Sequence, residues 1–75
     1  MQKTILELAK ELDFNSEIDY FNYIIESFVN GNKQQCIKLF NKLDRNNKVY
    51  FMTQFLDEES ETDKRVKEIL IIELI

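Results

Sequence analysis

The pattern of apolar and polar positions divides this chain into helical stretches separated by short polar breaks. In the first stretch, the i, i+3, i+4, i+7 spacing of one buried helix face is followed by Ile5, Leu8, Ala9 and Leu12. Thr4 and Glu7 have the spacing of a capping box, in which each residue bonds the backbone of the other. The next letters, "DFNS", end the pattern because Asp, Asn and Ser side chains compete for backbone hydrogen bonds. A helix is therefore predicted from about Thr4 to Leu12.

A second helix is predicted from Asn15 or Ser16 to about Asn30. Its expected inner face consists of Ile18, Phe21, Ile25, Phe28 and Val29, widened by Tyr20 and Ile24. Gly31, the only glycine in the chain, follows directly. Helices often end at a residue in the left-handed conformation, which glycine adopts without a steric cost. Gly31 is therefore predicted to end this helix.

Two further helices are predicted after the glycine, each beginning beside a residue that suits an N-cap. Asn32 precedes the third helix, with Gln35 three residues on. Asp44 precedes the fourth helix, which is predicted from about Arg45 to Leu56. The expected inner faces are Cys36, Leu39, Phe40 and Leu43 in the third helix and Val49, Met52, Phe55 and Leu56 in the fourth.

A fifth helix is predicted from about Glu61 to the end of the chain, after the acidic segment "DEESETD". Ser60 or Thr62 is expected to cap it. Carboxylates in this segment also favour a helix start, because the N-terminal end of a helix carries partial positive charge.

The last ten residues, "VKEILIIELI", place apolar side chains in almost every direction around a helix. A helix that is apolar all round is either central in its domain or shared with a second chain. For the second case, the candidate self-association residues are Ile69, Ile71, Ile72 and Ile75. A strand paired with a second copy of the tail is a further alternative. A membrane contact is not expected, because the flanking charges are mainly acidic and surface-binding helices are typically basic.

The fold class follows from these elements and from the scarcity of turn residues. The chain has no proline and one glycine, so it hardly supplies the turns that would join strands. Its 75 residues make one domain at most. We therefore expect residues 1–75 to form a single all-α domain, a small bundle of four to five short helices. The C-terminal helix is expected to be central or at a self-association interface.

The composition removes most kinds of chemistry. The chain has no histidine, which excludes Ser–His and Cys–His pairs and histidine metal ligands. Its single cysteine, Cys36, excludes an internal disulfide and a cysteine-rich zinc site, and one glycine excludes a glycine-rich phosphate loop. The plentiful carboxylates are interpreted as a solvated charged face. No enzyme activity, catalytic residue, cofactor or metal site is therefore predicted.

The sequence also bears on location and source. The amino terminus lacks the apolar core of a signal peptide, and no stretch reaches the length of a transmembrane helix. A cytoplasmic protein is expected, in which Cys36 is a small buried hydrophobe. The frequent Lys, Asn, Ile, Phe and Tyr have A/T-rich codons, which suggests a low-GC bacterium, phage or plasmid as the source.

Charge is divided unevenly along the chain. Residues 1–30 carry a net charge of −4 (two basic, six acidic), residues 31–48 carry +4 (five basic, one acidic), and residues 49–75 carry −4 (three basic, seven acidic). The candidate face for nucleic acid or an acidic partner consists of Lys38, Lys42, Arg45 and Lys48. A helix after a short turn is where a helix-turn-helix protein reads DNA. The alternatives are an ordinary solvated helix face or an acidic protein partner, and the acidic total disfavours nucleic acid.

Three tyrosines, Tyr20, Tyr23 and Tyr50, form a candidate partner patch. Tyrosine contributes contact area at a low cost in conformational entropy, which makes it common in binding sites. The alternative is packing at the core boundary with the hydroxyl groups in water.

These observations predict a small non-enzymatic protein–protein interaction module, an adaptor or regulator. The acidic ends are expected to attract a basic partner, and a homodimer is possible. The alternative function is a nucleic-acid-binding regulator that uses the basic face of the third and fourth helices. A third possibility is an assembly piece whose tail docks into a larger complex.

Overall fold

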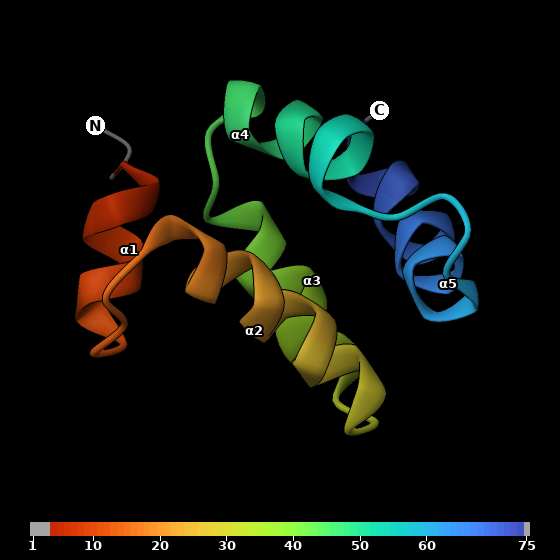
Figure 1. Ribbon diagram of the computed structural model, residues 1–75, viewed down its shortest axis with the longest axis horizontal. Helices are drawn as coiled ribbons and strands as arrows, with labels where there is room; N and C mark the ends of the chain where they lie inside the picture. The colour runs from red at the N-terminus through yellow and green to blue at the C-terminus, as the bar shows by residue number, and fades with distance from the viewer. Residues whose placement is uncertain (1–3, 75) are drawn as a thin grey trace.

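The computed structural model describes residues 4–74, which form five α-helices and two shorter helical turns (Figure 1). The helices are α1 (Ile5–Glu11), α2 (Glu17–Val29), α3 (Lys33–Asn41), α4 (Arg45–Tyr50) and α5 (Glu61–Leu70). A π-helical turn, η1 (Phe51–Phe55), continues α4, and a 3₁₀ turn, η2 (Ile71–Leu74), continues α5. No strand occurs within residues 4–74, so the predicted all-α bundle is confirmed.

Each α-helix begins at a side-chain cap, as the sequence predicted. Thr4 and Glu7 form a full capping box, because the Thr4 hydroxyl accepts from the Glu7 amide (3.2 Å) and Glu7 Oε1 accepts from the Thr4 amide (3.2 Å). The caps of α2 to α5 are Ser16, Asn32, Asp44 and Ser60. Gly31 has φ +83°, the left-handed conformation expected after α2. The four connections between successive helices therefore end at the capping residues that the sequence indicated.

The fourth predicted helix changes its winding in the middle. The Leu56 amide donates to the Phe51 carbonyl (3.1 Å), which closes the wider π turn. Phe51 is fully buried, whereas Val49, expected inside, is 41% exposed. Met52 and Leu56 are buried as predicted.

One hydrophobic core joins the helices, and Phe51 lies among its aromatic rings. The Phe51 centroid is 5.3 Å from that of Phe21, 5.8 Å from Phe40 and 5.6 Å from Phe55. The predicted inner face of α3 is confirmed, because all of its members are buried: Cys36, Leu39, Phe40 and Leu43. Leu12 was expected inside but is 39% exposed, because α1 ends at Glu11 and the chain turns away.

The predicted inner face of α2 is confirmed in part, because Ile25 and Phe28 are half-buried against the core and the predicted Tyr20, Phe21 and Ile24 are fully buried. The buried residues are Tyr20, Phe21, Ile24 and Ser27. Ile18 and Val29, expected inside, are 58% and 62% exposed. The contacts of α2 with α1, α3 and α5 leave these two apolar side chains in solvent.

The tail is a helix that is buried in part and exposed in part. It is helical, so the strand alternative is wrong. Val66 and Leu70 are fully buried in the core, and Ile69 is half-buried. Ile71 and Ile72 are 44% and 66% exposed, while Ile75 lies outside the described residues. A homodimer through this tail stays a prediction.

Within residues 4–74, no helix has both the length and the apolar character needed to cross a bilayer.

Candidate functional site

A set of hydrogen bonds fixes the orientation of α2 against α3. The Tyr20 hydroxyl donates to the Leu39 carbonyl (2.7 Å) inside the core. Gln35 Nε2 lies 2.8 Å from the Tyr23 hydroxyl and 3.0 Å from Ser27 Oγ, and donates to both. Ser27 Oγ in turn donates to the Tyr23 carbonyl (2.9 Å). Because these partners are buried or half-buried, rotating α2 would leave polar groups unpaired, which is costly.

The predicted tyrosine patch does not exist as one surface. Tyr20 is 1% exposed, so its assignment to an exposed patch is wrong. Tyr23 is half-buried and packs edge-on against Phe14, with ring centroids 5.5 Å apart. Tyr50 alone is mainly exposed, at 52%, and its ring stacks on Phe21 with centroids 6.0 Å apart. The tyrosines of α2 point inward because the helix buries the face that carries them.

Burial also suppresses the acidity of two core groups. Burial, with a smaller contribution from the charge of Glu11, raises the pKa of Tyr20 to about 12. Burial alone raises the pKa of the Cys36 thiol to about 11. Both groups therefore stay protonated at neutral pH, and Cys36 supplies no thiolate for nucleophilic chemistry.

The predicted basic face is only partly continuous. Lys38, Lys42 and Arg45 are exposed, whereas Lys48 is half-buried, with Nζ 5.7 Å from the centroid of the Phe40 ring. Asn41, between Lys38 and the C-cap residue Lys42 in the sequence, donates from Nδ2 to Glu73 Oε1 (2.7 Å). This bond places a carboxylate beside the basic side chains.

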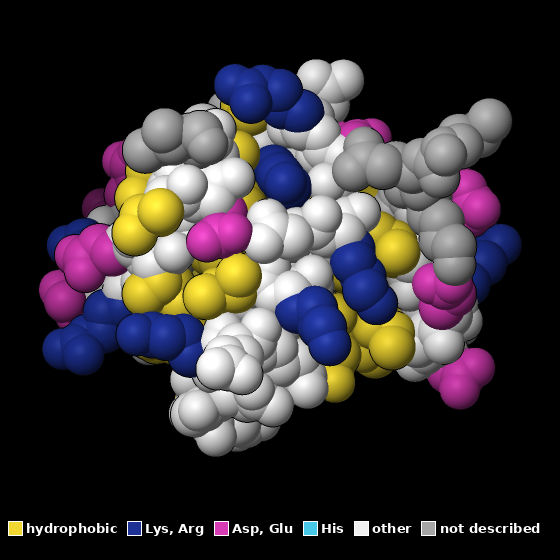
Figure 2. Space-filling model, turned by 180° about the vertical axis from the view of Figure 1, so that it is seen from behind, with side chains coloured by type: hydrophobic (Ala, Val, Ile, Leu, Met, Phe, Trp, Pro, Cys, Tyr) yellow, Lys and Arg dark blue, Asp and Glu magenta, His cyan; other side chains and the backbone are white. Residues whose placement is uncertain are grey.

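Figure 2 shows one whole face of the molecule, with its charged side chains coloured. The Lys and Arg side chains on it form separate groups among apolar and uncharged side chains. A continuous basic surface for a phosphate backbone is therefore not visible on this face.

The most distinctive surface is the outer face of α2, which we define as Ile18, Asn22, Ile25 and Val29. These positions follow the i, i+4, i+7, i+11 spacing of a single helix face. Ile25 is half-buried, and the other members of the face are exposed.

Acidic side chains accompany this face. Glu17, Asp19 and Glu26 lie on α2 and are exposed. None of them forms an ion pair with another residue of the 4–74 segment. Between Lys10 and Lys33, the sequence contains five acidic residues and no Lys or Arg. All charged side chains that α2 carries are therefore acidic.

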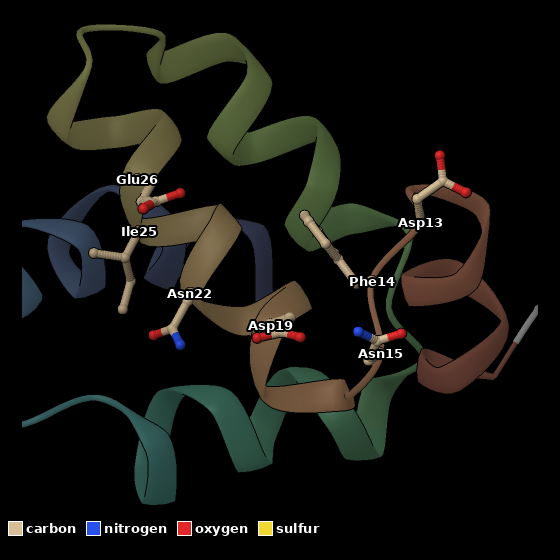
Figure 3. A pocket seen from close by; sticks show the side chains of 7 residues that line it. All are labelled: Asp13, Phe14, Asn15, Asp19, Asn22, Ile25 and Glu26. Atoms are coloured by element: carbon tan, nitrogen blue, oxygen red, sulfur yellow. The ribbon is translucent and has the colours of Figure 1, made fainter.

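Two open hollows adjoin the outer face of α2. The first has a volume of about 520 Å³ and is lined by Asp13, Phe14, Asn15, Asp19, Asn22, Ile25 and Glu26 (Figure 3). Its lining comes from α2 and from the connection between α1 and α2. The second, of about 450 Å³, is lined by Glu17, Ile18, Phe21, Asn47, Tyr50 and Phe55.

The two hollows differ in chemistry. The first contains three carboxylates and two side-chain amides. Even so, nowhere in residues 4–74 are three His, Cys, Asp or Glu side chains placed to share a metal ion. The second is an aromatic groove, in which Phe21 lies 5.0 Å from Phe55 and 6.0 Å from Tyr50 between ring centroids. Its lining also includes the amide of Asn47 and one carboxylate, Glu17.

Sequence reasoning missed the outer face of α2, because Ile18 and Val29 were assigned to the core. Two features of the sequence indicate this outer face. The helix has more apolar positions than one inner face needs, and the helix lies in the longest stretch of the chain without a basic residue. Comparison with family models, curated proteins and solved structures finds no match to this chain. The function proposed for it therefore rests on its own residues.

Proposed function

We propose that this chain is a small non-enzymatic module that binds another protein, as an adaptor or regulator. The observation that carries the proposal is its exposed apolar surface. Within residues 4–74, large apolar side chains are exposed by 39% to 66% at Leu6, Leu12, Ile18, Val29, Val49, Tyr50, Ile71 and Ile72. Single exposed apolar residues are ordinary, but grouped ones mark interaction sites. Here Ile18 and Tyr50 line one groove, and Ile71 and Ile72 are adjacent in the tail.

The charge distribution supports a basic partner. Both ends of the sequence carry a net charge of −4 around a middle of +4. Opposite potentials on two proteins raise the rate of encounter and suppress wrong partners. A partner with exposed Lys and Arg would meet carboxylates on α2 that have no ion pair with other residues of the described segment.

The direct test is capture of partners followed by titration with purified components. The tagged chain is used as bait in extracts of cells that make it. Beads that carry the tag alone are the control. Each enriched protein is then purified and titrated by calorimetry. We expect saturable one-to-one binding to a protein of net positive charge, weakening as salt rises. If no enriched protein binds saturably, the proposal is wrong.

Reversing charges tests whether the acidic segment increases the rate of association with a basic partner. Changing Asp57, Glu58 and Glu59 together to Lys should slow association and flatten its dependence on salt. The matched control reverses Lys38 and Lys42 to Glu, which should leave association with a basic partner as fast as before or faster. Unchanged association rates in the first variant would exclude electrostatic steering by this acidic segment.

A second candidate function is nucleic-acid binding through Lys38, Lys42, Arg45 and Lys48. The exposure of the first three favours it. The Glu73 carboxylate, bonded to Asn41 beside the lysines, opposes it. A fluorescence titration with labelled DNA and RNA at about 50 mM salt separates the two functions, because phosphate binding is strongest at low salt. Binding that disappears in Lys38→Glu would favour this candidate.

A further inference from the structure

We propose that the outer face of α2 binds a basic amphipathic helix of another protein. This inference rests on the proposed function and deepens it, because it names the surface and the chemical class of the partner. The face presents the exposed apolar side chains of Ile18 and Val29, with the half-buried Ile25 between them packing partly against the core. Exposed carboxylates lie on the same helix.

The apolar part of the face has the spacing that a helix can match. At a rise of about 1.5 Å per residue, Ile18 and Ile25 lie about 10 Å apart along α2. The same distance separates positions i and i+7 of a partner helix, which lie on one face of it. The groove of Ile18, Phe21, Tyr50 and Phe55 lies at one end of this span. It gives the first anchor side chain of the partner a recess to fill.

The charge on α2 selects a basic partner. Asp19 and Glu26 line the first hollow and Glu17 lines the groove, so carboxylates are present in both recesses. Lys or Arg side chains flanking the apolar anchors of the partner would pair with them. Such charge-assisted hydrogen bonds are stronger than neutral ones, especially where the helix pair excludes water.

The same charge argues against the other occupants. A second copy docked through its own α2 would bring acidic side chains together with no basic residue between Lys10 and Lys33 to pair them. A second copy docked through α3 would present Lys38 and Lys42, with Ile37 half-buried, and so would leave the groove unfilled. Nucleic acid and anionic membranes would be repelled by the carboxylates.

A helical partner fits better than an extended one. Residues 4–74 contain no strand, so no sheet edge is present on which an extended peptide could complete its hydrogen bonds. A helix satisfies its own backbone groups and presents only side chains to the face. Docking of this kind is the helix-in-groove mode of recognition, with anchors at i, i+4 and i+7.

The probe is a synthetic peptide of Leu and Lys in which all Leu residues share one helix face. Two matched peptides serve as controls: one with the same composition and the Leu residues spread around the helix, and one with Glu in place of Lys. Binding to the full chain is measured by fluorescence anisotropy of the labelled peptide. The site is mapped from amide shifts of the ¹⁵N-labelled protein. We expect binding of the first peptide only, with the largest shifts in α2 and η1.

Two double variants test the face itself. Ile18→Ser with Val29→Ser removes exposed anchors and should weaken binding by about tenfold or more. Gln34→Ser with Arg65→Ser changes exposed polar side chains on α3 and α5, outside the face, and should change affinity by less than about twofold. Circular dichroism confirms that both variants keep the wild-type helix content. Neutralising Glu17, Asp19 and Glu26 to their amides should flatten the salt dependence.

The inference and the proposed function fail in different ways. Equal binding of all three peptides, shifts confined to α3 or α5, or no effect of the Ile18 and Val29 changes would overturn the inference. The proposed function would stand if proteins captured from cells still bound the chain. A wild-type dimer that dissociates in the Ile18 and Val29 variant would instead show a second copy as the occupant. Absence of both peptide binding and captured partners would overturn the two together.

Discussion

Helices α2 and α3 pack against each other, yet their solvent-facing sides differ in chemical character. The outside of α3 is polar and basic, with Gln34, Lys38 and Lys42 in solvent. The outside of α2 is apolar and acidic, and it lies between two hollows. The folded core accounts for one face of each helix. Ile18 and Val29 of α2 are not needed for this core, so the face that carries them is the part of the molecule best suited to a partner.

The same contrast appears in the polar groups between the two helices. Gln35 reaches from α3 to Tyr23 and Ser27 of α2 through hydrogen bonds of 2.8 Å and 3.0 Å. Tyr20 reaches back to the Leu39 carbonyl of α3. These bonds prevent α2 from exchanging its two apolar faces, because hydrophobic burial alone is not directional.

The largest effect is expected for the inner face of α3. Phe40→Ala removes a fully buried ring and should lower the free energy of unfolding by about 3–5 kcal/mol. A chain of this length has a total of about 4–11 kcal/mol, so the variant should be close to unfolding. Urea denaturation followed by circular dichroism measures the change, with Lys38→Ala on the exposed side of the same helix as the control. A loss below about 1 kcal/mol would contradict the central place of Phe40.

Alkaline pH should lower the free energy of unfolding, because Tyr20 of α2 and Cys36 of α3 are buried in the protonated form. Burial raises the pKa of Cys36 from 9.0 to about 11, and burial with the charge of Glu11 raises that of Tyr20 from 10.0 to about 12. Above pH 9 the unfolded chain loses these protons before the folded chain does, so stability falls as pH rises. The loss should be on the order of 2 kcal/mol for each group across its window.

Urea midpoints measured from pH 8 to pH 11 test this dependence. Cys36→Ala should remove the part of the decline that begins near pH 9, while the part due to Tyr20 remains. Equal slopes in the wild type and the variant would show that Cys36 ionises as easily in the folded state as in the unfolded one.

An intermediate loss of stability is expected when the hydrogen bonds from Gln35 of α3 to α2 are removed. Gln35→Ala removes both hydrogen bonds to α2 and should cost about 1–2 kcal/mol of unfolding free energy. Gln34→Ala is the matched control, because Gln34 is exposed on the same turn of α3. Equal stability of the two variants in urea would mean that water replaces Gln35 at no cost.

The sequence predicted the elements of the fold because their signals are local. Caps at Thr4, Asn32 and Asp44, and the left-handed Gly31, depend on a few neighbouring residues. The inner face of α3 was also predictable, because Lys, Gln and Asn leave only one apolar side. Local composition therefore determines a helix face when the opposite face is polar.

The sequence failed where the choice depends on distant contacts. In α2, Ile18 and Val29 are as apolar as the residues that are buried, and only packing against α1, α3 and α5 selects between them. Phe51 is buried in place of Val49, and both are apolar, so local sequence does not choose between them. No local signal distinguishes the π turn at Phe51–Phe55 from an α-helix. The candidate site was missed for the same reason, since its residues were counted as core.

The smallest change in stability is expected for substitutions on the outer face of α2. Comparing one of them with a substitution on the buried face of the same helix contrasts the two faces directly. Val29→Ala should change the free energy of unfolding by no more than about 0.5 kcal/mol, because 62% of the side chain is already in water. Ile24→Ala, on the buried face, should cost about 2–5 kcal/mol. If both variants lost stability equally, the second face would belong to the core. If only Ile24→Ala does, the apolar residues outside are free to bind a partner.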